Sequence, residues 1–309
     1  MSFMKYLRRI VQVLHPEELI AAPFLLFLVL FAAFSSFSIR FQPGLVHWLA
    51  ILALLYIGIF LCATALRLFR EHRKGIYLQH SFICDIFQVF RDWLPLIAIF
   101  IVYENLHDIV PLLAGSDQDA ALNAIDRALF GPIPWSVLLQ KIVSPWLTDI
   151  MYLSYSTLFL YIPVLAGIFH FTRQQKAWRI LLLALTRTAF TGFLLYLAVP
   201  AVGPGYYLAA SYNVDLNGAW ISEQVAPIFD TFRISRDVFP SLHVALSAVC
   251  LFVAWQYHKP SFYLFLPFVV GLWISTIYLR YHYTIDIFAG LALAYGTVFL
   301  SKKISERHE

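Results

Sequence analysis

Two short segments of the sequence combine histidine, aspartate and arginine at the start or end of an apolar stretch. The first runs from Arg236 to His243 and reads RDVFPSLH, and the second runs from Arg280 to Asp286 and reads RYHYTID. In the second segment, His282 and Asp286 are four residues apart, so they share one face if a helix begins there. The carboxylate can then accept a hydrogen bond from one imidazole nitrogen and leave the other nitrogen free to attack.

The first segment supplies groups that complement such a nucleophile. His243 would lie in the first turn of a helix, where it could protonate a leaving alkoxide. Ser241 and the unpaired backbone N–H groups of that turn can face an anion. Arg236 and Arg280 add bidentate donors of the kind that hold phosphate oxygens. Together these residue types predict a phosphoryl-transfer site that needs neither a metal nor another cofactor.

Two other interpretations of the same residues stay open at this stage. His243, His282 and Asp286 could instead bind a divalent cation, because histidine and carboxylate are usual ligands, although only three such ligands are apparent. Each arginine could also extend towards phospholipid head groups at a membrane edge without any part in catalysis.

The elements that would position these segments are membrane-spanning helices. Of the 309 residues, 61% are hydrophobic and 13% are charged, whereas an ordinary soluble domain has about 25% charged residues. Apolar runs such as 19–39 and 45–66 are long enough to cross a bilayer, where a helix satisfies its own backbone hydrogen bonds. The composition excludes a soluble domain, and the net charge of +4 gives no reason to expect a nucleic-acid partner.

The apolar windows, taken in order, predict an all-α polytopic bundle of about eight spans. They are expected at residues 17–39, 45–66, 93–114, 148–171, 178–200, 241–257, 261–279 and 283–301. Residues 116–147 contain several aspartates and prolines, which favours interfacial or short re-entrant helices over a further span. Residues 201–239 form the longest polar connection, and loops of such length are often functional.

The placement of lysine and arginine predicts the orientation of this bundle. If the N-terminus is inside, most of the 22 basic residues fall on the cytoplasmic side, as the positive-inside rule requires. Both termini would then be cytoplasmic, and the segments around His243 and His282 would meet on the non-cytoplasmic face. We expect an integral membrane protein, with the bacterial inner membrane as its location.

A few charged residues fall inside expected spans, where a charge needs a partner. Arg187 lies about midway along the span at 178–200 and should pair with another group. Glu104, His107 and Asp108 lie within the span at 93–114, and structural support is favoured for them over a role in an acceptor pocket.

The segment PSLH at 240–243, followed about 40 residues later by His282 and Asp286, resembles the motifs of the type 2 phosphatidic acid phosphatase superfamily. That superfamily includes the vanadium haloperoxidases. The resemblance implies a phosphohistidine mechanism, with His282 as the nucleophile and Asp286 as its orienting partner. His243 would be the acid that releases the leaving group and later the base, and Ser241 would contact the phosphate.

The chain departs from the phosphatases of that superfamily at two positions. Leu242 stands where they usually have glycine, and Thr276 stands where they have an arginine six residues before the nucleophile. Their Lys-x6-Arg-Pro motif is also absent. PSLH and HYTID instead look like the branch that contains inositol phosphorylceramide synthases and, more distantly, sphingomyelin synthases. This likeness implies transfer of a phospho-head-group between lipids, and the departures make Arg236 and Arg280 the best substitutes for the missing cations.

The resemblance also implies a division of the chain and a set of partners. Residues 93–309 would form a six-helix lipid phosphatase or phosphotransferase core, and residues 1–92 a two-helix N-terminal addition with a cytoplasmic loop. The partners would be a lipid phosphate or phospholipid substrate, the bilayer and, for a transferase, a lipid alcohol acceptor.

Two other functions compete with this one. The first is a transporter of a lipid or small anion, but transporters often carry internal repeats and midplane sites, and neither feature is apparent here. The second is a non-catalytic scaffold, which is disfavoured because His243, His282 and Asp286 form a complete set.

Overall fold

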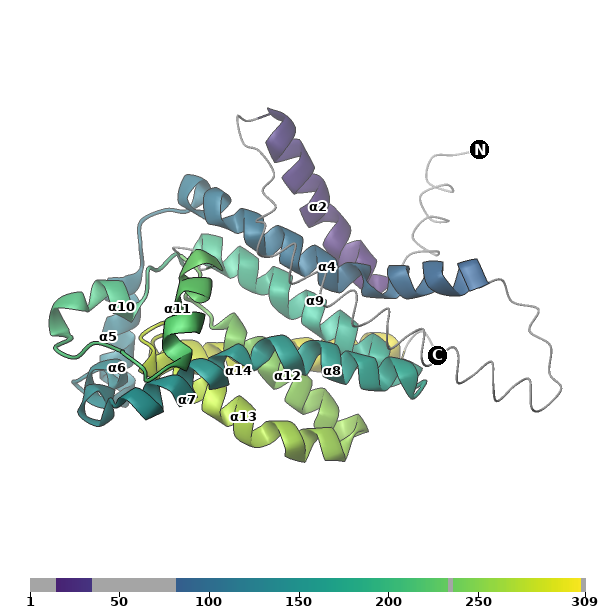
Figure 1. The fold of residues 1–309 in the computed structure, drawn as a ribbon. Helices are drawn as coiled ribbons and strands as arrows, with labels where there is room; N and C mark the ends of the chain where they lie inside the picture. Colours follow the sequence, from purple (N-terminus) through teal and green to yellow (C-terminus); the bar gives the residue numbers. More distant parts are fainter. Residues whose placement is uncertain (1–14, 35–81, 233–235, 307–309) are drawn as a thin grey trace.

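The computed structural model of the 309-residue protein describes residues 15–34, 82–232 and 236–306. These residues contain helices and no strand, and the long helices lie side by side in one elongated bundle (Figure 1). Four segments of the described chain are long and apolar enough to cross a membrane, and α12 is apolar but shorter. The predicted all-α membrane bundle is therefore confirmed.

Every expected span except 45–66, which lies outside the described residues, corresponds to a helix. These helices are α2 (Pro16–Phe34), α4 (Phe82–Leu113), α7 (Pro145–Ser156) with α8 (Leu158–Phe171), α9 (Gln175–Ala198), α12 (Leu242–Tyr257), α13 (Lys259–Tyr278) and α14 (Thr284–Ser305). Helix α4, which corresponds to the third expected span, begins at Phe82 and not near residue 93, so position 91, expected in a cytoplasmic loop, is part of α4.

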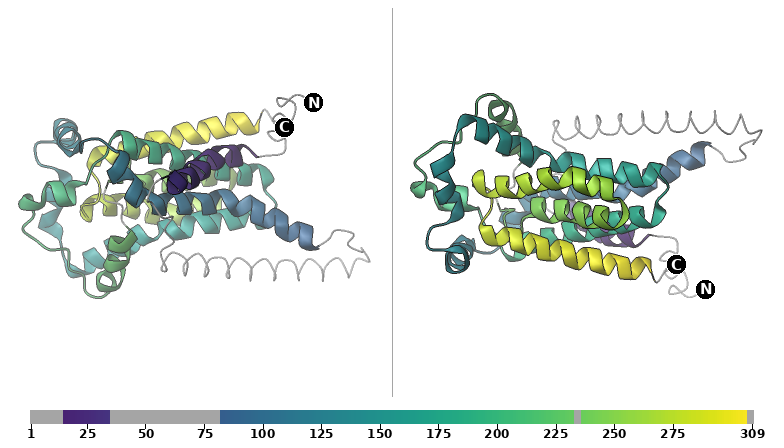
Figure 2. Two further views of the ribbon diagram at one scale, coloured as in Figure 1. Left: turned by 90° about the horizontal axis from the view of Figure 1, so that it is seen from above. Right: turned by 90° about the horizontal axis from the view of Figure 1, so that it is seen from below.

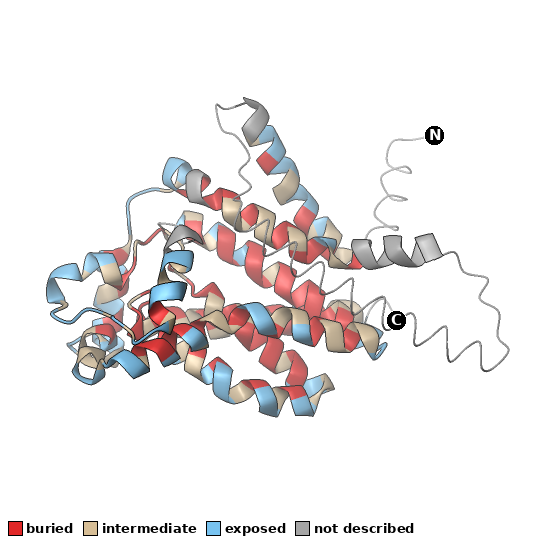
Figure 3. Ribbon diagram, viewed as in Figure 1, coloured by how far each residue is buried: buried red, intermediate tan, exposed pale blue. Residues whose placement is uncertain are grey.

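The core of the bundle lies around α9 and α12, whose side chains are buried on most faces (Figure 3). In a bilayer, helices are held together by close packing and by hydrogen bonds between them. Thr188 in α9 and Thr297 in α14 are hydrogen-bonded with their oxygens 2.7 Å apart. Trp273 Nε1 in α13 donates to Ser247 Oγ in α12 at 2.9 Å. These contacts fix how α12 and α14, which carry the two motifs, sit against their neighbours.

Short helices gather at one end of the bundle, where α9 ends and α12 and α14 begin (Figures 1 and 2). They are α5 (Asp119–Phe130), α6 (Trp135–Leu138), the 3-10 helix η1 (Leu139–Ile142), α10 (Pro204–Tyr207), the 3-10 helix η2 (Ala209–Ser211) and α11 (Ile221–Phe232). Residues 116–147 thus form short helices and no further span.

Near the start of α9, Arg179 joins three helices. Its guanidinium donates to Glu17 Oε1 in α2 at 2.9 Å and to Asp92 Oδ1 in α4 at 2.7 Å. Both carboxylates are buried. The arginine therefore attaches α2 and α4 to the core by ion pairs shielded from solvent.

Arg179→Ala should destabilise the folded protein by about 3 kcal/mol or more, because it leaves two buried carboxylates without a counterion. The measurement is the midpoint of thermal unfolding in detergent. Lys141→Ala, which removes an exposed cation from η1, is the matched control and should leave the midpoint unchanged. Equal midpoints for the two variants would contradict this role of Arg179.

Candidate active site

The two motifs found in the sequence lie together where α12 and α14 begin. The backbone N–H of Ser241 donates to the Asp286 carbonyl with an N–O distance of 3.3 Å. The ring centroids of His243 and His282 are 6.1 Å apart, so one phosphate ester can contact both rings. Ser241, His282 and Asp286 are buried, and His243 is half-buried. Four of the six predicted site residues are thus brought to one place.

A glycine lets the two helices approach closely enough for this. A Cβ atom added at Gly290 in α14 would lie 2.7 Å from the Ser241 carbonyl oxygen and 3.2 Å from Val244 Cβ. Contacts under 3.0 Å are essentially never seen for real Cβ atoms. Only glycine therefore permits the first turn of α12 to lie directly against α14.

Gly290→Ala should push the start of α12 away from α14 and lower turnover about a hundredfold, since a misplacement of about 1 Å has effects of that size. Gly296→Ala in the same helix is the control, because a Cβ there meets no atom within 4 Å. Both variants are compared by kcat and by the midpoint of thermal unfolding. Equal kcat values for the two variants would show that the close approach is not needed for activity.

The turn after α13 presents His282. Arg280 adopts a left-handed conformation (φ 64°), and its N–H donates to the Ile277 carbonyl at 3.0 Å. The N–H groups of Tyr281 and His282 donate to the Thr276 carbonyl at 3.0 and 3.1 Å. This is a Schellman-type helix end with arginine at the position that usually holds glycine.

Thr276, one of the two departures from the phosphatase pattern, has a structural place in this turn. Its hydroxyl donates to the Trp273 carbonyl at 2.7 Å, and the residue is buried. Its side chain is therefore directed back to its own helix, while its carbonyl holds the backbone of His282.

The hydrogen bonds of His282 indicate which ring nitrogen carries the proton. Its Nδ1 lies 2.9 Å from the Val238 carbonyl oxygen and 3.4 Å from Asp286 Oδ2. A carbonyl only accepts, so the tautomer with a proton on Nδ1 is the one that fits, and Nε2 keeps a lone pair. Asp286 Oδ2 also accepts from the Tyr283 N–H at 2.8 Å, which caps α14. The imidazole ring of His282 is thus oriented by two acceptors, the Val238 carbonyl and the Asp286 carboxylate.

His243 has a partner that the sequence did not indicate. The Tyr155 hydroxyl in α7 lies 3.2 Å from His243 Nδ1, and the two rings stack with centroids 4.2 Å apart. Phe229 in α11 contacts Tyr155 edge-on at 4.9 Å. A phenol both donates and accepts, so it can serve neutral and protonated forms of His243. Among 17 tyrosines, no spacing singles out this one.

The start of α12 is capped by Ser241 and packed against α9. Ser241 Oγ accepts a long hydrogen bond from the Val244 N–H at 3.4 Å, and so acts as the N-cap. The Leu242 side chain points to α9, where it occupies the space left by Gly192. The leucine that replaces the usual glycine is therefore accommodated by packing. The N–H groups of Ser241, Val244 and Ala245 donate to acceptors within the protein, so the helix dipole is what favours an anion at this end.

The two predicted phosphate-binding arginines are each engaged with a partner. Arg236 donates from Nε and from a terminal nitrogen to Asp117 at 2.5 and 3.1 Å, and this carboxylate raises the pKa of the arginine. Arg280 donates to the Val214 carbonyl and lies 4.0 Å from the centre of the Tyr212 ring. Both side chains are thus bound to other groups at this end of the bundle.

Other expectations about charged residues have mixed outcomes. Within the described ranges, none of the ion pairs includes Arg187, so the expected partner is not found there. The side chains of His107 and Asp108 lie outside the described residues. Among the described residues, no group of three His, Cys, Asp or Glu side chains is placed to hold a metal ion.

Two aspartates of helix α5 accept hydrogen bonds from the segments next to the site. Asp119 accepts from the N–H groups of residues 202 and 203 and from the Tyr283 hydroxyl, each at 2.8 Å. Asp126 accepts from the Ile285 N–H at 2.8 Å and the Thr284 hydroxyl at 3.1 Å, and burial raises its pKa. Two aspartates seven residues apart lie on one helix face. That spacing is the sequence signal that could have assigned them a structural role.

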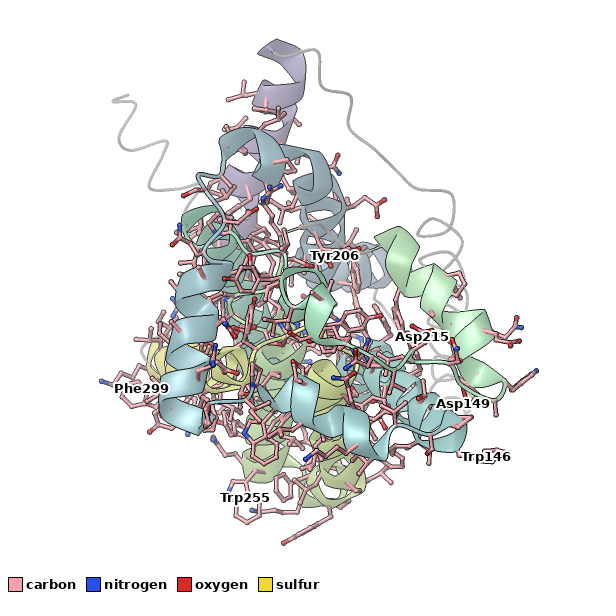
Figure 4. The ribbon with its side chains drawn as sticks, turned by 90° about the vertical axis from the view of Figure 1, so that its left-hand side faces the viewer. Trp146, Asp149, Tyr206, Asp215, Trp255 and Phe299 are labelled. Atoms are coloured by element: carbon pink, nitrogen blue, oxygen red, sulfur yellow. The ribbon has the colours of Figure 1, made fainter. Side chains whose placement is uncertain are left out.

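The long connection between α9 and α12 covers this end, which faces the viewer in Figure 4. Its labelled residues Tyr206 and Asp215 lie in front of the ends of the long helices (Figure 4). Asp149 in α7 accepts from the N–H groups of Trp220 and Ser222, each at 2.9 Å, and thereby fixes the start of α11. The connection is thus anchored to the bundle on both sides of the site.

Comparison with known proteins places this arrangement in a family. A family model described as the PAP2 superfamily matches residues 120–300, which is more than half of the chain and includes both motifs. The chain belongs to the PAP2 superfamily. The resemblance seen in the two motifs is confirmed.

One curated protein of known name is similar to this chain over part of its length. Over 196 residues, or 57% of this chain, the sequence is 27% identical to the phosphoinositol dihydroceramide synthase of Bacteroides thetaiotaomicron. The matched region spans 64% of the length of that relative. No solved structure matches the chain.

Proposed function

We propose that this protein is a metal-independent lipid phosphatase or phospho-head-group transferase that acts through a phosphohistidine on His282. The observation that carries the proposal is the hydrogen bond between His282 Nδ1 and the Val238 carbonyl, with His243 on the other side of the site. This hydrogen bond leaves the Nε2 lone pair as the nucleophile. The 6.1 Å between the two ring centroids places His243, as the acid, within reach of the same ester.

In the first step, His282 Nε2 attacks phosphorus. The N–P bond forms while the bond from phosphorus to the lipid alcohol oxygen breaks, and His243 gives a proton to that oxygen. The Val238 carbonyl and the Asp286 carboxylate stabilise the positive charge that develops on the imidazole of His282. The products of this step are the free lipid alcohol and the phosphoenzyme.

In the second step, the oxygen of water or of an acceptor alcohol attacks phosphorus. The N–P bond breaks, and His243 takes the proton from the attacking oxygen. In both steps the Ser241 hydroxyl would contact the phosphoryl oxygens, and the positive end of the α12 dipole favours their negative charge. Arg236 and Arg280 are the proposed additional cations, and phosphate would compete there with Asp117 and the Val214 carbonyl.

We favour transfer to a lipid alcohol over hydrolysis. The relative in Bacteroides is named a synthase, and Leu242 stands where phosphatases usually have glycine. In this proposal residues 93–309 are the catalytic core and residues 1–92 an addition to it. The distribution of basic residues supports cytoplasmic termini and a site on the non-cytoplasmic face, in the bacterial inner membrane.

Mass-spectrometric product analysis tests this function. Purified protein is incubated with phosphatidic acid and with phospholipids, with and without diacylglycerol or ceramide as the acceptor. A new phospholipid that forms only with the acceptor is the expected result, and free phosphate or a free phospho-head-group would indicate a phosphatase. Failure of the enzyme to convert any lipid of the panel would contradict the proposal.

A further inference from the structure

Tyr283 follows the proposed nucleophile in the chain and adjoins both groups that hold it. The N–H of Tyr283 donates to Asp286 Oδ2 at 2.8 Å. Its side chain is part of a small buried apolar cluster that also contains Val238 and Leu122. The Val238 carbonyl and the Asp286 carboxylate are the two acceptors beside His282 Nδ1, at 2.9 and 3.4 Å. A shift of Tyr283 would therefore move both acceptors and, with them, the imidazole of His282.

The hydroxyl of Tyr283 is held by a carboxylate of α5. It donates to Asp119 Oδ1 at 2.8 Å, and both residues are buried. Asp119 also accepts from two backbone N–H groups of the connection after α9, at Oδ1 from Gly203 and at Oδ2 from Val202, each at 2.8 Å. The phenol is therefore anchored to α5 and, through the same carboxylate, to the start of the connection that covers the site.

The side chain at position 119 must be a carboxylate to accept these three hydrogen bonds. Asparagine would offer one acceptor oxygen, and its amide N–H groups would meet the Val202 N–H. A buried charge is costly unless it is hydrogen-bonded or paired, and no ion pair among the described residues includes Asp119. The three donors therefore compensate for the charge, and one of them is the side chain of the neighbour of the nucleophile.

We propose that Asp119 and Tyr283 are positioning residues for the transfer reaction, which hold the imidazole of His282 at the angle from which Nε2 attacks phosphorus. This rests on the proposed function, because it takes His282 as the nucleophile. Neither residue exchanges a bond or a proton in the two steps, and both act through the acceptors Val238 and Asp286. The pair therefore contributes to the rate of the chemical steps and not to the binding of the lipid.

Tyr283→Phe removes the hydroxyl and keeps the ring in its cluster. With phosphatidic acid as the substrate, kcat should fall about tenfold to a hundredfold while KM stays unchanged, since a misplacement of about 1 Å has effects of that size. Tyr295→Phe, which removes an exposed hydroxyl further along α14, is the matched control and should keep the wild-type kcat. Equal kcat values for the two variants, or a change in KM alone, would overturn the proposal.

Asp119→Asn alters the same hydrogen bond from the side of α5. It should lower kcat at least as much as Tyr283→Phe, because it also disturbs the Val202 N–H. Glu223→Gln, which neutralises an exposed carboxylate of α11, is its control and should keep the wild-type kcat. The midpoint of thermal unfolding is measured for all four variants. A loss of kcat in Asp119→Asn that Tyr283→Phe does not share would contradict the proposed pair.

Nuclear magnetic resonance of protein with ¹⁵N-labelled histidine tests the position of the ring without any substrate. The Nδ1–H signal of His282, identified by its absence in His282→Ala, should persist in the wild type and in Tyr295→Phe, because this proton is hydrogen-bonded. It should be lost by exchange with water in Tyr283→Phe. If the wild type converts no lipid, the proposed function fails and this signal alone decides. Its loss in Tyr283→Phe would support the positioning role, and its persistence there would overturn that role.

Discussion

His282→Ala should reduce turnover of every lipid substrate by a factor of about 10⁴ or more, since removal of a catalytic nucleophile has effects of that order. The helices should still insert and pack, because the backbone hydrogen bond from residue 282 to Thr276 does not depend on the side chain. Phosphorus from a radiolabelled lipid phosphate should appear on the wild-type protein in an acid-labile, alkali-stable linkage. No such label should appear on the variant.

The matched control for this variant is His258→Asn. His258 caps the start of α13, away from the site, and its Nδ1 accepts from the Ser261 N–H at 3.3 Å. Asparagine preserves a cap of that kind, so His258→Asn should keep wild-type turnover and labelling. Substantial turnover by His282→Ala, or labelling of that variant, would refute the phosphohistidine assignment.

The spans and the meeting of the two motifs could be predicted because both depend on residue type along the chain. Long apolar runs identify helices in a bilayer whatever their neighbours are, and each motif adjoins such a run. The shared helix face expected for His282 and Asp286 was wrong, because α14 begins at Thr284 and His282 lies in the turn before it. Asp286 reaches the ring from the first turn of the helix, at 3.4 Å from Nδ1. The start of the third helix could not be placed in this way. Residues 82–92 are more polar than the span that follows, so the apolar run begins later in the chain than the helix does.

The partners of the two histidines could not be predicted, for a different physical reason. His282 is held by the carbonyl of Val238, and a backbone carbonyl leaves no mark in the sequence. His243 contacts Tyr155, which is 88 residues away in the chain and one tyrosine among 17. The sequence likewise indicated arginines that could bind phosphate, but not the acidic partner of Arg236, because Asp117 is 119 residues distant.

His243→Ala should lower turnover of lipid phosphates by about 10² to 10⁴, the usual contribution of general acid–base catalysis. The lipid alcohol must be protonated as it leaves, and the variant has no acid there. For p-nitrophenyl phosphate the leaving phenolate is already stable, so the first step needs no acid. The second step still needs a base to take a proton from water.

His243→Ala should therefore release about one equivalent of nitrophenol per enzyme in a rapid burst, followed by a slow steady rate, as expected when a covalent intermediate accumulates. Stopped-flow absorbance measures both phases. Tyr155→Phe keeps the ring that stacks on His243 and removes its hydroxyl, so its lipid turnover should fall by a smaller factor and without a burst. Equal losses on lipid and aryl substrates in His243→Ala, with no burst, would mean that His243 supports the structure of the site and does not transfer protons. The two-step route would then need another acid.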